Sequence, residues 1–155
     1  ILMVTVHKIS EELFFDSFDL IALHCNLECY AMAYHINQVV DITLKRAKHD
    51  LEIDSYSYPM YEYHDEVNEQ GWFLIKNRIQ VEENEVGDGL FQNSKTMKTK
   101  YFLEERKEIN YLLKLWPEST IEIDKTVDAI RSVSKILMAY VLDIDSLKSK
   151  RNLIF

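Results

Sequence analysis

The chain has 155 residues, of which 47% are hydrophobic and 28% are charged, as in an ordinary globular protein. This length is typical of a single domain whose core needs neither a disulfide nor a metal. A formal net charge of -8 argues against general binding to nucleic acids or anionic membranes, since both are negatively charged. No apolar run reaches the length of a transmembrane helix, no signal peptide is visible, and there are only two cysteines, so we expect a cytoplasmic protein.

In the first third of the chain, the apolar run 20–23 predicts a strand buried on both faces. Asn26 is the expected N-cap of a helix over 27–38, because its side chain can accept a hydrogen bond from an unpaired backbone N–H. This helix has hardly any polar face, so we expect one side on the sheet and the other beneath a cover. Either the aromatic segment 14–18 or a second copy of the chain supplies that cover.

The middle of the chain predicts more strands and a loop. Three strands are expected, the first over 41–44 or on to 53, the others over 56–63 and 72–79. The turn residues before Gly71 join the last two as a hairpin. Residues 81–99 predict a long mobile loop, because they hold two glycines among Asn, Asp, Ser and Thr. Leu90 and Phe91 lie in this loop as an apolar pair that can anchor a partner.

The stretch 100–116 has two apolar runs on either side of a charged segment, residues 104–108, which we call the charged bend. Apolar residues alternate over 109–115, which favours a strand, although a helix competes for the same residues. Further on, Ser119 and Glu122 predict the capping box of a helix over 122–137, and a short last strand follows.

Together these elements predict one α+β domain over 1–155, a mainly antiparallel sheet of five to seven strands with two helices on one face. The order strand–helix–strands–helix–strand resembles ferredoxin-like arrangements with an inserted hairpin. The expected core consists of Leu20, Ile21, Leu23, Tyr30, Tyr34, Ile42, Leu44, Trp72, Leu74, Ile109, Tyr111, Leu113, Val127, Ile130 and Leu137.

The charged bend and the strand after it also resemble a known signature. Leu-Glu-Glu at 103–105, three residues, then Ile-Asn-Tyr at 109–111 is similar to the signature of the IPExxxVDY family of small bacterial proteins. Glu105 and Tyr111 are identical to the signature, and two apolar residues replace other apolar ones. Glu stands in place of the signature Pro, and Asn110 in place of the signature Asp.

Two other stretches, 20–25 and 147–155, are similar to further parts of that family, so the resemblance covers nearly the whole chain. It implies a shared fold and a bacterial source, and it implies no chemistry. The missing Asp at position 110 argues against a catalytic carboxylate there.

The candidates for chemistry are few. A thiol near a helix N-terminus can have a lowered pKa, which makes Cys25, beside His24, the sharpest nucleophile hypothesis. A zinc site built from these two residues with Cys29 and His35 has poor expected geometry, because the four side chains do not converge. Two buried, inert thiols explain the same residues. We therefore assign no catalytic, cofactor or metal site, and we lean against an enzyme.

Two basic clusters, 45–49 and 148–151, can form a phosphate-binding face on this acidic protein. No stacking aromatics interleave with either cluster in the sequence. We expect the second cluster to dock onto acidic residues of the chain or of a partner, rather than onto nucleic acid.

The function that the sequence favours is protein–protein binding or self-association. Tyr30 and Tyr34 lie one turn apart on the apolar helix and suit an interface, as Leu90 and Phe91 do in the loop. We expect a homodimer with these tyrosines at the contact. The alternative is a small enzyme or ligand-binding domain with a pocket near His24 and Cys25.

Overall fold

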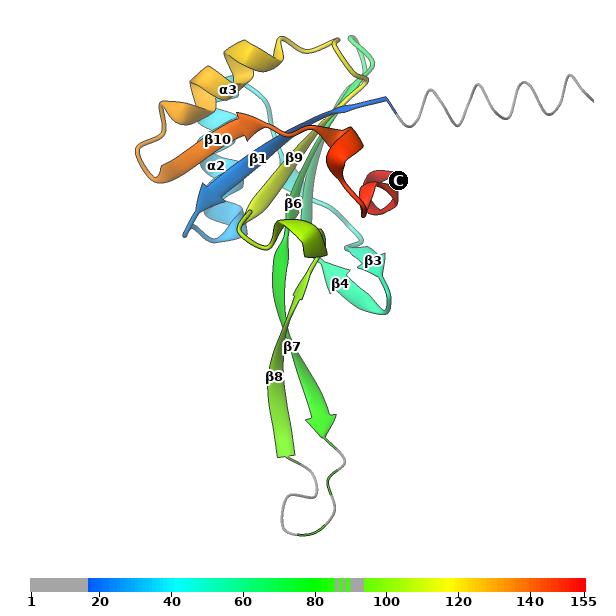
Figure 1. Ribbon diagram of the computed structural model, residues 1–155. Coiled ribbons are helices and arrows are strands. Elements are labelled where there is room, and N and C mark those ends of the chain that lie inside the picture. The colour runs from blue at the N-terminus through cyan, green and yellow to red at the C-terminus, as the bar shows by residue number, and fades with distance from the viewer. Residues whose placement is uncertain (1–16, 86, 88, 90–93) are drawn as a thin grey trace, which may run out of the picture.

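The computed structural model describes residues 17–85, 87, 89 and 94–155. Its centre is an antiparallel sheet with the strand order β10-β1-β9-β6-β5-β2 (Figure 1). The six strands are β1 (Asp19–Cys25), β2 (Lys45–Arg46), β5 (Met60–Asp65), β6 (Gln70–Lys76), β9 (Tyr111–Trp116) and β10 (Ile136–Val141). The predicted fold class, including the strand count, is confirmed.

Two helices, α2 (Cys29–Val40) and α3 (Ile123–Arg131), cover one face of this sheet (Figure 1). Strand β9 lies between β1 and β6 and is antiparallel to both, so β1 and β6 run in the same direction. With the other strands set aside, the chain runs β1-α2-β6-β9-α3-β10 in the order β10-β1-β9-β6, which is the split βαβ arrangement of ferredoxin-like folds.

The opposite face of the sheet is also covered. It packs against the small hairpin of β3 (Leu51–Ile53) and β4 (Tyr56–Tyr58) and against three short 3₁₀ helices. These are η1 (Glu104–Arg106), η2 (Ile144–Ser146) and η3 (Lys150–Leu153). One sheet therefore separates two apolar cores, which explains why the central strands are apolar at successive positions.

Strand β9 shows this two-sided burial and one exception to it. Leu113 and Leu115 face the helices, whereas Leu112 and Lys114 face the second core. Lys114 is only 1% exposed. Its Nζ donates to the backbone oxygen of Leu153 at 2.6 Å and lies 4.0 Å from the ring centroid of Phe155. The buried ammonium thus holds the last residues of the chain against the sheet.

A second hairpin, β7 (Arg78–Glu85) with β8 (Ser94–Tyr101), projects away from the sheet (Figure 1). The predicted loop over 81–99 is therefore wrong for 81–85 and 94–99, which are strands. At the base of this hairpin Ile79 is buried and Val81 packs against the second core, but beyond them most side chains are polar and solvated, so apolar and polar residues no longer alternate. Leu90 and Phe91 lie outside the described residues.

Both predicted helix starts need correction. Helix α2 begins after Glu28, not after Asn26, and no side chain caps it. Helix α3 begins after Glu122, also without a side-chain cap, so the capping box does not form. Ser119 instead takes a φ of 60° and donates its backbone N–H to Asp19.

The end of the second helix also differs from the prediction. Helix α3 stops at Arg131 rather than at 137, because the residues from Ile136 pair with β1 as an outer strand. The serines and β-branched residues after Arg131 are weak helix formers, so pairing with the sheet prevails. Leu137, expected in the core, is consequently 70% exposed.

Most of the predicted core is buried. Besides Leu137, the errors are Tyr30 and Tyr34, which are 69% and 60% exposed on the outer side of α2. Ile42 is partly buried. No helix in the described part of the chain is both long and apolar enough to cross a membrane.

Candidate functional site

The two residues proposed for chemistry lie on opposite faces of β1. Cys25 is 2% exposed in the core beneath the helices, whereas His24 turns toward Tyr140 on the other face. Burial raises the pKa of the Cys25 thiol, and it raises that of Cys29 to about 11. Neither thiol is therefore ionised near neutral pH, and His24 is not placed to activate Cys25.

A cavity of about 270 Å³ does open beside Cys25, at the end of β1. Its lining includes Glu28, Lys76 and Arg78, but not His24. The Nζ of Lys76 lies 3.9 Å from the carboxylate of Glu28. The structure thus provides a cavity near Cys25 without the imidazole that the enzyme hypothesis requires.

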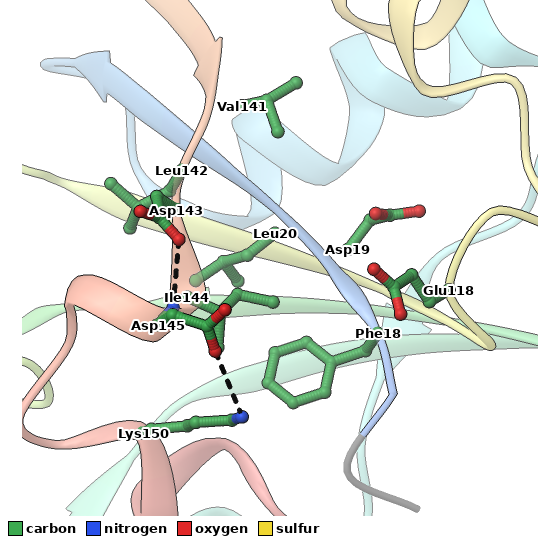
Figure 2. A pocket seen from close by; sticks show the side chains of 10 residues that line it. All are labelled: Phe18, Asp19, Leu20, Glu118, Val141, Leu142, Asp143, Ile144, Asp145 and Lys150. Carbon is green, nitrogen blue, oxygen red and sulfur yellow. Dashed lines mark hydrogen bonds and ion pairs between the residues drawn. The ribbon is translucent and has the colours of Figure 1, made fainter. Parts of the chain in front are cut away.

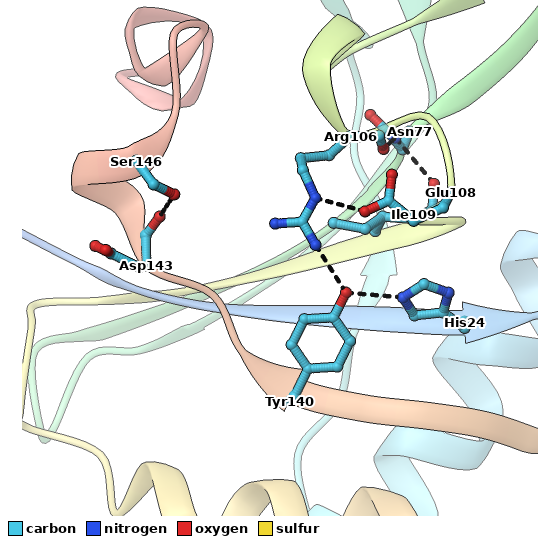
Figure 3. A network of polar contacts seen from close by, with 8 residues as sticks. All are labelled: His24, Asn77, Arg106, Glu108, Ile109, Tyr140, Asp143 and Ser146. Carbon is cyan, nitrogen blue, oxygen red and sulfur yellow. Dashed lines mark hydrogen bonds and ion pairs between the residues drawn. The ribbon is translucent and has the colours of Figure 1, made fainter.

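His24 belongs instead to a polar network that sequence reasoning missed (Figure 3). The hydroxyl of Tyr140, on β10, is 2.9 Å from His24 Nε2 and accepts a hydrogen bond from Arg106 at 3.0 Å. Arg106 also donates to Glu108, and this contact raises the pKa of the guanidinium and lowers that of the carboxyl. The network fastens the charged bend to the two strands at the sheet edge.

Three residues at positions of the IPExxxVDY signature, of which Glu105 and Tyr111 are identical to it and Asn110 is not, have structural partners. Glu105 accepts hydrogen bonds of 2.7 Å from the backbone N–H and the hydroxyl of Ser149. Asn110 Oδ1 accepts from the backbone N–H of Cys25 at 2.9 Å, and the Tyr111 hydroxyl donates to a backbone oxygen at 2.6 Å. The three stretches that carry the resemblance therefore meet in space, and their contacts stabilise the fold.

A separate cavity of about 310 Å³ is acidic (Figure 2). Its carboxylates belong to Asp19, Glu118, Asp143 and Asp145, and Lys150 is the cation in its lining. Three of these carboxylates accept hydrogen bonds from nearby backbone N–H or hydroxyl groups, and the fourth lies 3.7 Å from Lys150 Nζ. Among the residues that the structure describes, no group of His, Cys, Asp and Glu is arranged to hold a metal ion.

The hairpin β7–β8, which we call the arm, bears complementary charges along its two strands. Lys95 Nζ lies 3.5 Å from Glu82, and Lys98 Nζ lies 2.6 Å from Glu83. Met97, on β8, is 61% exposed and adds an apolar contact point. The arm is therefore a charged ribbon whose ion pairs hold its two strands together.

The outer side of α2 presents the aromatic pair that the sequence assigned to an interface. Tyr30 and Tyr34 are both largely exposed, and the Tyr34 ring packs edge-on against His35. Phe18, the one described aromatic of the segment 14–18, is buried in the core on the opposite face of the sheet. It therefore does not cover these tyrosines.

No family model, curated protein or solved structure matches the chain.

Proposed function

We propose that the protein acts in the cytoplasm by binding another protein, without catalysis of its own, and that the arm makes the contact. The observation that carries this proposal is that two eight-residue strands leave the body and pair only with each other among the described residues. The free thiols of Cys25 and Cys29 support the reducing compartment.

Beyond Ile79 and Val81 at its base, the arm adds little to the core from which it projects. A two-stranded hairpin is marginally stable on its own in water, so a binding partner is a physical reason for its length. Its outer edges carry backbone N–H and C=O groups that can pair with a strand of another protein. The exposed lysines and glutamates then select a partner edge of complementary charge.

Site-specific crosslinking in the native cell tests this proposal. A photoreactive phenylalanine analogue replaces Met97 on the arm or, as the matched control, Val67 in the turn between β5 and β6. Val67 is 91% exposed, and the turn between β5 and β6 that carries it lies at the opposite end of the molecule from the arm (Figure 1). We expect a discrete crosslinked protein from position 97 and none from position 67.

The second part of the test is a variant in which a two-residue turn replaces residues 80–99. It is expected to keep the body's thermal unfolding midpoint within a few degrees. The body loses the packing of Val81 and the hydrogen bond from Tyr56 to Glu83, but it loses no strand pairing of the main sheet. The variant should also lose the proteins that copurify with the full chain. Equal crosslinking from both positions, or unchanged copurification after trimming, would contradict the proposal.

A further inference from the structure

A cavity of about 470 Å³ lies where the arm joins the body. Its walls come from the β3–β4 hairpin, the end of β8, the bend at η1 and the segment that leads into η3. It is lined by three cations, Lys100, Lys148 and Arg151, and by two carboxylates, those of Asp54 and Glu104. The lining is thus more positive than negative in a protein whose net charge is -8.

The cations of this cavity form no close ion pair with a described carboxylate, although the charge of Lys100 acts on Glu83 from a longer distance. Among the described residues, no carboxylate oxygen lies within 4.0 Å of the charged nitrogens of Lys100, Lys148 or Arg151. Glu104 is engaged elsewhere, since it lies 3.7 Å from Lys107. Asp54 is the other acid of the lining, on the turn between β3 and β4, where it adopts a φ of 50°. Two more carboxylates border the cavity but are already engaged, since Glu83 accepts a hydrogen bond from Tyr56 and Glu105 accepts two from Ser149.

The backbone that carries two of these cations is fixed in place. The Glu105 carboxylate accepts hydrogen bonds from the backbone N–H and the hydroxyl of Ser149. The Asn152 amide donates to the backbone oxygen of Phe102 at 3.0 Å. Leu153, directly after them, is fully buried. A segment anchored on both sides of Arg151 loses little further freedom when a ligand binds, which favours affinity.

Aromatic side chains form the rest of the wall. The Lys100 Nζ lies 4.9 Å from the ring centroid of Tyr56, and the Tyr56 hydroxyl donates to Glu83 on the arm. Tyr58 packs edge-on against Phe102, with the ring centroids 5.3 Å apart. The cavity therefore joins a cationic rim to a rigid aromatic wall, and its volume lies within the range of small-molecule sites.

We infer that this cavity binds a small organic phosphate, with Lys148, Arg151 and Lys100 around the phosphate and the tyrosine wall against the organic part. A phosphate monoester carries nearly two negative charges and several acceptor oxygens, which suits three cations better than a single carboxylate does. The site is distinct from the outer edges of the arm and does not depend on a protein partner.

Titration of the isotope-labelled full chain at low ionic strength tests the inference by NMR. The probes are AMP, glucose 6-phosphate and inorganic phosphate, with adenosine and glucose as uncharged controls. The two organic phosphates differ in their organic part, so comparing them distinguishes a nucleotide from a sugar phosphate. We expect at least one of them to shift the backbone amides of 148–152 and 100–102 at millimolar concentration or below, more strongly than inorganic phosphate, and the uncharged controls to have no effect.

The decisive comparison uses two double variants of equal charge change. Lys148→Gln with Arg151→Gln removes two cations of the cavity, whereas Lys45→Gln with Lys48→Gln removes two exposed cations of the other basic cluster. We expect the first pair to weaken binding about tenfold or more, because it removes charge-assisted contacts, and the second pair to leave it unchanged.

Two results would overturn the inference. One is the absence of amide shifts with every phosphate probe up to about 5 mM, which corresponds to negligible affinity. The other is equal weakening by the two double variants, since that pattern indicates diffuse attraction to surface charge.

Discussion

At the scale of single residues, the side chain that fixes the most structure is Asn77, between β6 and β7. It is fully buried, and its amide nitrogen donates to the backbone oxygens of Arg106 and Ile109, both at 2.9 Å. Its amide oxygen accepts from the Leu103 N–H at 2.7 Å. Every polar atom of the side chain is thus paired, and the three partners lie in the charged bend or directly beside it.

We expect Asn77→Ala to lower the free energy of unfolding by about 3 kcal/mol, because it leaves buried backbone groups of the bend without partners. Denaturation with urea measures the change. Asn84→Ala is the control: Asn84 is exposed on the arm, and its replacement should change stability by less than about 0.5 kcal/mol. A loss below about 1 kcal/mol for Asn77→Ala would mean that water readily replaces these bonds.

The sequence contains little sign of such residues. The alternation over 109–115 correctly predicts a strand, because burial of apolar side chains acts at fixed spacing. Asn77 looks like an ordinary turn residue, since its partners lie up to 32 positions away. In the same way, nothing near Tyr140 indicates that it meets His24, which is 116 positions distant.

At the scale of elements, the bend at η1 is hydrogen-bonded to the C-terminal segment 147–153, which we call the tail, and we call this contact the clasp. Glu105 holds Ser149 by two hydrogen bonds, and this contact fixes the segment that leads into η3. Burial works against ionisation of Glu105, but the hydrogen bonds from Ser149, together with those from the backbone of Lys148 and of Glu105 itself, outweigh it and lower the pKa of the carboxyl below its ordinary value of 4.5. Because this pKa is lower in the folded state than in the unfolded chain, the clasp contributes its full stability at pH values above the pKa of the unfolded chain. That stability is lost as the pH falls through the pKa of the folded state.

We therefore expect the tail to detach on acidification before the sheet unfolds. The NMR amide signals of 147–153 should move to disordered positions below about pH 4, while those of β9 stay in place. Ser149→Ala should shift this transition to higher pH. Ser146→Ala is the matched control, because the Ser146 hydroxyl donates to a backbone oxygen and does not touch Glu105. Simultaneous loss of tail and sheet signals would contradict a separate clasp.

The types of most elements were predictable, but several boundaries were not. Helix α2 and the β5–β6 hairpin follow from apolar spacing and from turn residues. The shortening of α3 was not predictable from local pattern, because Ile136 is drawn into pairing with Cys25 across 111 positions. The arm was missed because most of its side chains beyond Ile79 and Val81 are polar and solvated, so the apolar alternation on which the prediction relies ends there.

At the scale of the whole molecule, the exposed pair on α2 bears on the oligomeric state. Tyr30 and Tyr34 lie on the side of the helix that faces away from the sheet, and the described aromatic Phe18 packs on the other face. Burial of apolar area stabilises a complex by about 25 cal/mol per Å². A second copy packed over this side of α2 therefore gains several kcal/mol, which offsets the free-energy cost of association.

We expect a homodimer whose light-scattering mass at micromolar concentration is twice the 18.4 kDa of one chain. Tyr30→Glu with Tyr34→Glu should reduce the mass to that of one chain, because it places charges in the contact. Val67→Glu, at an exposed position of the turn between β5 and β6, should leave the mass unchanged. A single-chain mass for the unaltered protein would rule out this dimer.

The strand order also determines when the sheet can form during synthesis. Strand β1 is completed by residue 25, yet its two neighbours, β9 and β10, begin only at residues 111 and 136. The first strand must therefore wait, unpaired, until most of the chain has left the ribosome. Such distant pairings make folding slow, and they leave an apolar strand exposed to aggregation or to chaperones in the meantime.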